Sequence, residues 1–259
     1  MKISVCIITK NEEKDLTRCL TSIRDLADEI IVVDDGSTDK TVAIAKKYRA
    51  KVFTRKLDNF ASQKNYAVEK ATGDWIFAID ADEEVTPSLR DEILQITNAK
   101  LQKGNGLHHK IGQINGYLVP RRNIILGAEI KHTRWSPDKH VWLFRKGKGT
   151  WVGDIHEEVE VEGWTGELTN AKIHYQYETV TEFFAMLNNY TEREANKLVK
   201  EGRKFSYFQL FYAPLLSFFR RYIYKKGFLD GWRGFVLSYM MAIYRMTTWI
   251  KVWEKQYTV

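Results

Sequence analysis

Two carboxylates separated by one residue, Asp80 and Asp82, directly follow the apolar run Trp75-Ile76-Phe77-Ala78-Ile79, which has the length of a buried strand. At the end of a strand, both carboxylates could point into one crevice and supply the oxygen ligands that Mg²⁺ or Mn²⁺ prefers. A bound diphosphate would complete the coordination of such a cation. The alternative is structural, because Asp80 could cap the next turn while Asp82 stays solvated. The pair on its own leaves both interpretations open.

Two further polar clusters follow apolar runs in the same way. Thr9-Lys10-Asn11-Glu12 follows the run at residues 3–8, and Asp34-Asp35-Gly36-Ser37-Thr38-Asp39 follows the β-branched run at residues 29–33. Such residues are typical of a turn that ends a strand and caps a helix. An aspartate in this position could instead accept a hydrogen bond from a nucleobase N–H group, with Thr9 adjacent in the same crevice.

The elements that must position these clusters alternate along the first hundred residues. Strands joined by helices pair in parallel through right-handed crossovers, so the pattern predicts an α/β fold, Rossmann-like, with a mostly parallel sheet between helices. Ligands of such sheets bind outside the carboxyl ends of the strands, and the three clusters should therefore converge on one edge. Strands are predicted at residues 3–8, 29–33, 51–54, 75–79, 116–120, 141–145, 159–161 and 171–175, helices over about 12–24, 39–48, 60–71, 86–96 and 181–200, and a loop over 99–115.

The same clusters, in this order and spacing, resemble the nucleotide-sugar half of family 2 glycosyltransferases. The resemblance covers residues 2–90 and is carried by Ser4–Glu12, Val32–Thr41, Phe60–Ala67, Ala71–Ile76 and Asp80–Glu83. Later stretches, including residues 153–158 and 226–234, resemble the branch that contains lipopolysaccharide-core β-glucosyltransferases. The resemblance implies a GT-A fold and an inverting transfer of a hexose, expected to be glucose, from a UDP-sugar to a lipopolysaccharide-core or other lipid-linked glycan acceptor.

The resemblance also implies roles for particular residues of the first half. Asp82 would bind the Mg²⁺ or Mn²⁺ that bridges the diphosphate. The segment Ser62-Gln63-Lys64-Asn65 only approximates the Ala-Arg-Asn form that is common in the family, but it retains a basic residue. The donor-binding residues would be Thr9 and Asp35 at the uracil, Glu12 at the border of the same pocket, Asp80 near the ribose and Lys64 near the nucleotide.

An inverting displacement needs a group that takes the proton from the acceptor hydroxyl, and it needs no covalent intermediate. This base must come from the second half of the chain, because the first half is committed to the nucleotide. The densest group of proton acceptors there is Asp154-Ile155-His156-Glu157-Glu158. Position in the family favours Glu157, with Asp154 and His156 as rivals. The alternative is an edge strand that carries solvated acids.

Two arginine pairs lie in the same half of the chain. Arg121-Arg122 and Arg134-Trp135 could bind phosphate or carboxylate groups of an acceptor, because arginine recognises such oxyanions with two parallel hydrogen bonds. An ordinary surface role is the alternative for both pairs.

The end of the chain is basic and aromatic. The last 60 residues hold eleven Lys or Arg residues against three Asp or Glu residues, and 17 of the 34 aromatic residues. Residues 205–219 carry no charge and residues 235–250 carry only Arg245, but each stretch is too short to cross a hydrocarbon core of about 30 Å. We expect helices that lie in the headgroup region of an anionic membrane, or helices that pack on the catalytic domain with solvated charges.

Composition bounds the remaining possibilities. The chain has 259 residues, 44% hydrophobic and 28% charged, which excludes disordered and fibrous classes. Cys6 and Cys19 form no metal or disulfide pattern and are expected to be buried free thiols in a reducing compartment. No secretory signal is expected, since Met1-Lys2 leads straight into a short strand. The expected location is therefore cytoplasmic, peripheral on the inner face of the cell membrane.

The predicted organisation is a GT-A domain over residues 1–178, with a nucleotide-sugar-binding half at 1–98 and an acceptor half at 115–178, followed by a helical, membrane-proximal extension at 179–259. The expected partners are a nucleotide-sugar, a glycan or glycolipid acceptor and an anionic membrane surface. Nucleic acid is not expected, because no recognition motif accompanies the basic charge. A nucleotidyltransferase is the alternative enzyme, although residues 9–12 lack the glycine-rich signature it would need. A non-catalytic, membrane-associated nucleotide-binding scaffold is the other alternative, and the intact Asp80 and Asp82 argue against it.

Overall fold

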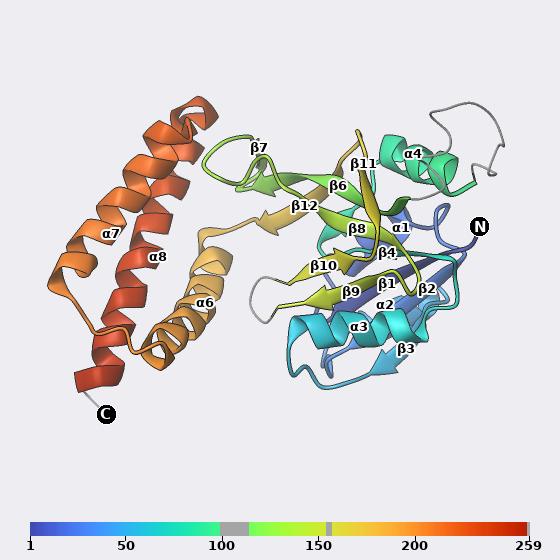
Figure 1. Cartoon of the computed structure of the whole chain (residues 1–259), viewed down its shortest axis with the longest axis horizontal. Coiled ribbons are helices and arrows are strands. Elements are labelled where there is room, and N and C mark those ends of the chain that lie inside the picture. Colours follow the sequence, from blue (N-terminus) through green and yellow to red (C-terminus); the bar gives the residue numbers. More distant parts are fainter. Residues whose placement is uncertain (99–113, 154–156, 258–259) are drawn as a thin grey trace. The chain divides into compact units, whose positions relative to one another are not determined.

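The computed structural model describes residues 1–98, 114–153 and 157–257 (Figure 1). The chain forms two compact units. The first, unit 1, comprises residues 1–121 and 138–174, and the second, unit 2, comprises residues 122–137 and 175–259. The expected α/β class with a helical C-terminal extension is confirmed. The functional division at residue 178 stays a prediction.

The sheet of unit 1 begins with four parallel strands, in the order β3-β2-β1-β4. Antiparallel strands extend it beyond β4, where β8 pairs with β4 and β6 pairs with β8. A separate antiparallel hairpin is made by β9 and β10. The strands are β1 (Ile3–Thr9), β2 (Glu29–Asp34), β3 (Lys51–Thr54), β4 (Trp75–Ala78), β5 (Glu83–Glu84), β6 (Ile114–Ile125), β7 (Ala128–Ile130), β8 (Lys139–Arg145), β9 (Gly149–Val152), β10 (Glu158–Val161), β11 (Trp164–Glu167) and β12 (Lys172–Tyr177).

Strand β1 is buried on both faces, which is why its sequence is a continuous apolar run instead of an alternating one. Val5 and Ile7 belong to one hydrophobic cluster, with residues of α1, α2 and α4, whereas Cys6 belongs to another, with residues of α3. Helices therefore cover both faces of the parallel strands. These helices are α1 (Leu16–Ser22), α2 (Thr41–Lys47), α3 (Phe60–Lys70) and α4 (Pro87–Asn98). Cys6 and Cys19 are buried and free, as predicted.

The predicted strands are present, with differences in length. Strand β6 runs over 12 residues, although the sequence predicts only residues 116–120. Pro120, Arg121 and Arg122 interrupt its apolar pattern, and the pairing of β6 with β8 and β7 maintains the strand beyond them. The short strands β5, β7, β9 and β11 were not predicted, because their sequences, such as Glu83-Glu84 and Trp164-Thr165-Gly166-Glu167, contain neither an apolar run nor a clear alternation. The predicted loop over 99–115 falls almost entirely outside the described residues.

The helices of unit 2 pack against the long helix α8 (Gly231–Tyr257). Helix α6 (Val180–Lys200) begins at a capping box of Thr179 and Glu182, and Phe183 and Leu187 pack with Leu237 and Met240 of α8. Helix α7 (Tyr207–Phe219) continues into a π-helical turn, η1 (Arg220–Tyr224), and a 3₁₀ turn, η2 (Gly227–Asp230), precedes α8. Within the described residues, no helix is both long enough and apolar enough to cross a membrane.

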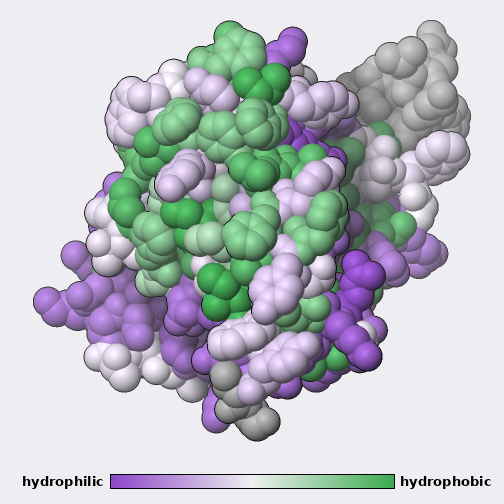
Figure 2. Space-filling model, turned by 90° about the vertical axis from the view of Figure 1, so that its left-hand side faces the viewer, coloured by the Kyte–Doolittle hydropathy of each residue, from purple (hydrophilic) through white to green (hydrophobic). Residues whose placement is uncertain are grey.

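One side of α7 is apolar and exposed, and we call it the α7 face. No residue of α7 is fully buried, and Figure 2 shows a broad hydrophobic area on the side of the molecule to which α7 belongs. Aromatic and aliphatic side chains thus meet solvent over the whole length of the helix. The α7 face consists of Tyr207, Phe208, Phe211, Tyr212, Leu215, Leu216 and Phe219, each at least 46% exposed.

Candidate active site

The three polar clusters lie at one edge of the sheet of unit 1, as the topology predicts. Thr9 ends β1 and pairs in register with Asp34, the last residue of β2. On the other side of β1, Cys6 pairs with Ala78, the last residue of β4, and Asp80 and Asp82 follow directly. The carboxyl ends of three adjacent parallel strands therefore carry or are followed by the predicted donor-binding residues, with the exception of Lys64, which lies on α3.

Asp34 shapes the turn after β2. Its Oδ2 accepts hydrogen bonds from the backbone N–H groups of Gly36 and Ser37, both at 2.9 Å, and its Oδ1 accepts one from the hydroxyl of Thr9 at 3.3 Å. Gly36 has φ of 74°, a conformation that glycine adopts without strain. Asp34 is buried and organises the turn, which leaves Asp35 as the aspartate near the rim.

Asp35 lies beside Thr9, because its backbone N–H donates to the Thr9 carbonyl at 2.9 Å. Its carboxylate accepts a hydrogen bond from the Leu57 N–H at 2.8 Å and pairs with Lys10 Nζ at 2.7 Å. The hydrogen bonds from Lys10 and Leu57 hold the pKa of Asp35 below its ordinary value. Thr9 and Asp35 are thus adjacent at the edge of the sheet, and their predicted contact with uracil stays a prediction.

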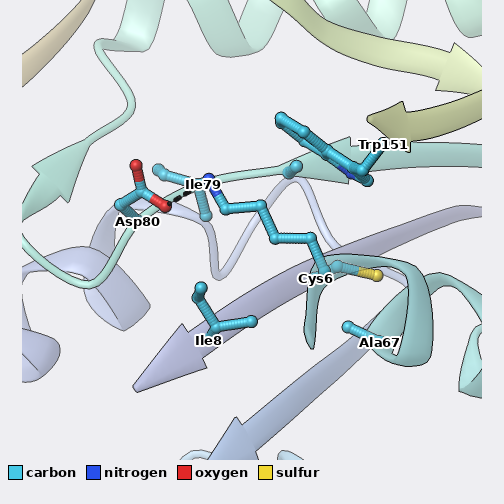
Figure 3. A pocket seen from close by; sticks show the side chains of 8 residues that line it. Cys6, Ile8, Ala67, Ile79, Asp80 and Trp151 are labelled. Carbon is cyan, nitrogen blue, oxygen red and sulfur yellow. Dashed lines mark ion pairs between the residues drawn. The ribbon is translucent and has the colours of Figure 1, made fainter. Parts of the chain in front are cut away.

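Lys64 of α3 joins a predicted donor-binding residue to the favoured base. Its Nζ lies 3.2 Å from Asp80 Oδ1 and 3.0 Å from Glu157 Oε1, and its side chain is only 7% exposed. The same Nζ lies 4.5 Å from the ring centroid of Trp151 and 5.0 Å from that of Trp142. Figure 3 shows Asp80 and Trp151 on the wall of the small pocket that Lys64 also lines, with the ion pair of Asp80 dashed.

Opposite charges keep Lys64 and Asp80 ionised in spite of burial. Burial opposes the charge of Lys64, but Asp80 and Glu157 outweigh it, and the pKa of Lys64 is raised. Burial likewise opposes the charge of Asp80, but Lys64, Lys172 and Arg121 together hold the pKa of this carboxyl well below its ordinary value. Asp80 is therefore a carboxylate near neutral pH.

Glu157 lies directly before β10, and the hairpin of β9 and β10 is attached to α3. The side-chain amide of Asn65 donates to the carbonyl of Trp151 and accepts from its N–H, both at 2.9 Å. Asn65 follows Lys64 directly in α3, so the same helix supplies the cation and the anchor of β9. The rival bases Asp154 and His156 lie outside the described residues.

A buried ionic network supports the Asp80–Asp82 turn. Glu83 and Lys172 are both fully buried, with 2.5 Å between Lys172 Nζ and Glu83 Oε2. The same carboxylate accepts a hydrogen bond from the backbone N–H of Asp80 at 2.9 Å and pairs with Arg121 at 3.3 Å. Lys172 Nζ also lies 3.2 Å from the ring centroid of Trp142, and burial lowers the pKa of Lys172 to about 8. Glu83 therefore fixes the start of the acidic turn.

Arg121 completes the network through its Nε, which lies 2.7 Å from Asp138 Oδ2. Both of its acidic partners belong to unit 1, and these ion pairs give Arg121 a structural role. A contact with an acceptor oxyanion stays a prediction. Arg122 pairs with Glu129 at 2.7 Å.

Asp82 faces a histidine that the sequence did not single out. Asp82 Oδ2 lies 3.2 Å from His174 Nε2, and His174 follows Lys172 on the inward side of β12. Nearby, burial and then the charges of Asp82, Asp15, Asp80 and Asp39 raise the pKa of Glu12 to about 7. This edge of the sheet therefore concentrates negative charge.

The donor set at this edge fits a divalent cation. Carboxylate oxygen suits Mg²⁺ or Mn²⁺, and an imidazole nitrogen is an additional ligand suited to a transition-metal cation such as Mn²⁺ more than to Mg²⁺. No three His, Cys, Asp or Glu side chains of the described ranges form a ready-made metal cluster, so Asp82 and His174 would supply two ligands and leave the others to substrate and water. The predicted metal ligand Asp82 is thus accompanied by a second candidate, His174.

Comparison with known proteins gives four findings. The glycosyl transferase family 2 profile matches residues 4–100. An uncharacterized glycosyltransferase of Rickettsia felis is 32% identical over 255 residues, which cover 98% of this chain and 90% of the relative. The lipopolysaccharide core biosynthesis glycosyltransferase LpsC of Rhizobium meliloti is 27% identical over 98% of this chain and 93% of its own length. Among solved structures, S. aureus TarS 1-349 in complex with UDP-GlcNAc has a TM-score of 0.46 at 16% identity, covering 99% of this chain and 92% of that chain.

Proposed function

Because the chain belongs to glycosyltransferase family 2, we propose that it transfers a hexose, glucose in the first instance, from a UDP-sugar to a lipopolysaccharide-core or other lipid-linked glycan acceptor, with inversion. The observation that carries the proposal is the ion-paired group of Lys64, Asp80 and Glu157 beside Asp82, at the carboxyl ends of the parallel strands. The similarity to LpsC over almost the whole chain supports the acceptor class.

The donor would bind along the edge formed by β1, β2 and β4. Thr9 and Asp35 would contact the uracil, with Glu12 at the border of this pocket, because hydroxyl and carboxylate groups can accept its N–H hydrogen bond. Asp80 would accept hydrogen bonds from the ribose hydroxyls. Lys64 would place a positive charge near the diphosphate, and its burial against two tryptophan rings limits the freedom of that charge.

Asp82 and His174 would hold the divalent cation, Mg²⁺ or Mn²⁺, at the diphosphate. When bound, this cation supplies positive charge that stabilises the negative charge developing on the departing UDP. The surplus of carboxylates at this edge supports the assignment, because their mutual repulsion is relieved by positive charge.

Glu157 would accept the proton of the acceptor hydroxyl. Its Oε1 lies 3.0 Å from the ammonium of Lys64, and this ion pair would hold the carboxylate in place beside the acceptor hydroxyl. Asp154 and His156 are retained as rival bases in this proposal.

The α7 face would hold the protein on the inner face of the cell membrane, as a cytoplasmic peripheral protein, close to lipid-linked acceptors. Exposed aromatic side chains gain free energy by entering the headgroup region, and the α7 face is far larger than a scatter of single apolar residues. Anionic lipids attract nearby basic residues. Exposed basic residues follow the helix directly at Arg220, Lys225 and Lys226.

The proposal is tested by UDP release from a panel of UDP-sugars, with lipopolysaccharide-core oligosaccharide as acceptor and with Mn²⁺, Mg²⁺ or a chelator. We expect release with UDP-glucose that requires the cation, and a loss of about a hundredfold or more in Asp82→Asn. The matched control is Asp25→Asn, whose carboxylate is 76% exposed and should be dispensable. Wild-type release by Asp82→Asn would remove this residue from the metal site, and an absence of release with every donor would overturn the proposed function.

A further inference from the structure

Arg221 is a half-buried cation of unit 2 with no acidic partner among the residues that the structure describes. Its Nη1 donates a hydrogen bond to the carbonyl of Thr133 at 2.6 Å, and its guanidinium lies 5.0 Å from the ring centroid of Trp135. Within the described parts of the chain, no carboxylate forms an ion pair with it. A guanidinium has five N–H donors, so a single carbonyl leaves most of its capacity for hydrogen bonds unused.

The charges that surround Arg221 have the same sign as its own. Burial, and then Arg134, Arg245 and Arg220, lower the pKa of Arg221 to about 10. Arg245 is neutralised by Glu194 at 2.5 Å. Arg134 and Arg220 are exposed, and no carboxylate of the described residues pairs with either. Burying a cation among like charges is unfavourable unless an anion compensates it.

The turn that carries Arg134 is held rigidly in this arrangement. The carboxylate of Asp230 accepts hydrogen bonds from the backbone N–H and the Nδ1 of His132, both at 2.9 Å, and the Thr133 N–H donates to the carbonyl of Lys225 at 3.3 Å. Thr133 and Arg134 have φ of 59° and 75°, a left-handed conformation that costs free energy in residues other than glycine. Such strain persists only where the surrounding contacts over-determine it, and it is common at ligand sites.

We propose that Arg221, Arg134 and Arg220 form a phosphate-binding site on the helical unit, which takes a phosphate ester attached to a lipid. Guanidinium groups bind phosphate with paired, charge-assisted hydrogen bonds, and they do so more strongly than they bind neutral groups. The lipid part of the ligand is indicated by the exposed apolar residues on either side in the sequence, Phe219 before Arg220 and Ile223 after Arg221. The inference deepens the proposed membrane contact. The lipid part of the ligand rests on that proposed contact, whereas the phosphate part does not.

The phosphate is tested first, with inorganic phosphate as the probe. We expect phosphate to raise the midpoint of thermal unfolding of the wild-type chain relative to sodium chloride of equal ionic strength, which controls for screening. The shift should be lost in Arg221→Gln and reduced in Arg134→Gln, an exposed position where the fold is preserved. Arg203→Gln is the matched control, because it removes the same charge from an exposed position. The 13-residue helix α7 lies between Arg203 and Arg220 and spans about 20 Å. A shift that is the same in all four proteins, or is absent from the wild type, would overturn the site.

The second arm separates the sources of the phosphate. Sedimentation with phosphatidylcholine vesicles, with and without phosphatidylglycerol, is compared for the same four proteins. Extra binding to phosphatidylglycerol that is lost in Arg221→Gln and Arg134→Gln, but kept in Arg203→Gln, supports a lipid headgroup. Extra binding that falls equally in all three variants contradicts the headgroup assignment, because it reflects net charge alone. UDP release is measured in parallel. Because these arginines lie outside unit 1, an absence of UDP release by the wild-type protein would count against the proposed function and not against the phosphate site.

Discussion

At the scale of single residues, the ammonium group of Lys64 is the centre of the candidate site. It contacts Asp80, which is proposed to bind the donor, and Glu157, which is proposed to accept the proton of the acceptor hydroxyl. In this proposal one buried charge would act on both reactants. Substitutions of the two carboxylates should therefore separate the two roles.

Glu157→Gln preserves the size of the side chain and its ability to accept a hydrogen bond from Lys64, but it removes the basic carboxylate. We expect kcat to fall by about 10²- to 10⁴-fold, the usual contribution of a general base, with little change in the affinity for the UDP-sugar. Single-turnover kinetics and donor titration measure the two quantities. Glu69→Gln, at a side chain that is 68% exposed, is the control. Turnover at the wild-type rate in Glu157→Gln would transfer the role to Asp154 or His156.

Glu83 and Lys172 make a second prediction at this scale. Glu83→Gln leaves the ammonium of Lys172 buried without its counter-charge, and such a change costs about 3–5 kcal/mol of unfolding free energy. Lys172→Met in the same chain removes that charge, and the double variant should recover much of the loss. Urea unfolding of the two single variants and the double variant measures the coupling. Additive losses in the double variant would show that the pair does not act as a unit.

At the scale of secondary-structure elements, Glu29 connects the parallel strands. Its carboxylate at the start of β2 accepts hydrogen bonds from Ser4 of β1 at 2.6 Å and from the Thr72 N–H before β4 at 2.8 Å, and it pairs with Lys51 of β3 at 2.5 Å. Burial alone would raise the pKa of Glu29, but the hydrogen bonds from these three residues lower it to about 2. The carboxylate thus stabilises the folded state.

This arrangement predicts how stability depends on pH. Because the pKa of Glu29 is about 2 in the folded state and 4.5 ordinarily, its contribution is complete above pH 4.5 and is lost as the pH falls toward 2. Glu29→Gln should lower the free energy of unfolding by about 3 kcal/mol at pH 7, and the difference from the wild type should shrink at pH 3. Urea unfolding at both pH values measures this, with exposed Glu160→Gln as the control. A difference that does not depend on pH would contradict the role of the charge.

The parts of the fold and site that the sequence predicts are those with local signals. The runs that become β1, β2 and β4 are apolar because both faces of these strands are buried, and the polar clusters follow them directly. His174 is 92 positions from Asp82, and no spacing rule links them. A signal was nevertheless present, because Lys172 and His174 alternate on the buried side of a predicted strand, where apolar residues are expected. Polar residues in such positions indicate partners elsewhere in the chain.

At the scale of the whole molecule, charge and apolar exposure are both concentrated near the C-terminus. The chain carries a formal charge of +7, and the excess of basic over acidic residues lies in its last 60 residues. The α7 face belongs to the same stretch. Electrostatic attraction and burial of apolar surface would therefore act on one region of the sequence.

Replacement of Phe211 and Leu215 by serine tests the contribution of the α7 face. These side chains are 68% and 60% exposed, so the fold should tolerate the change. Each apolar side chain is worth about 1.5–3 kcal/mol when it is fully buried, so binding to anionic vesicles should fall by at least about tenfold, while UDP release with a soluble acceptor is retained. Trp164→Ser, at an aromatic residue that is 71% exposed on β11, is the control. An equal loss in the control would indicate that general hydrophobicity, and not the α7 face, governs binding.

The two hydrogen bonds between Asn65 and the backbone of Trp151 have a consequence for how substrate preference can diverge in related enzymes. In the proposed mechanism helix α3 would present Lys64 to the leaving group, and the hairpin that it anchors leads to the proposed base. One helix would therefore set the distance between the leaving group and the base. Selection for a new acceptor can change side chains that follow Trp151. A shift of the hairpin backbone would instead disturb its hydrogen bonds to Asn65, and with them the helix that carries Lys64. Variation in acceptor choice should therefore accumulate in side chains and not in the path of the chain.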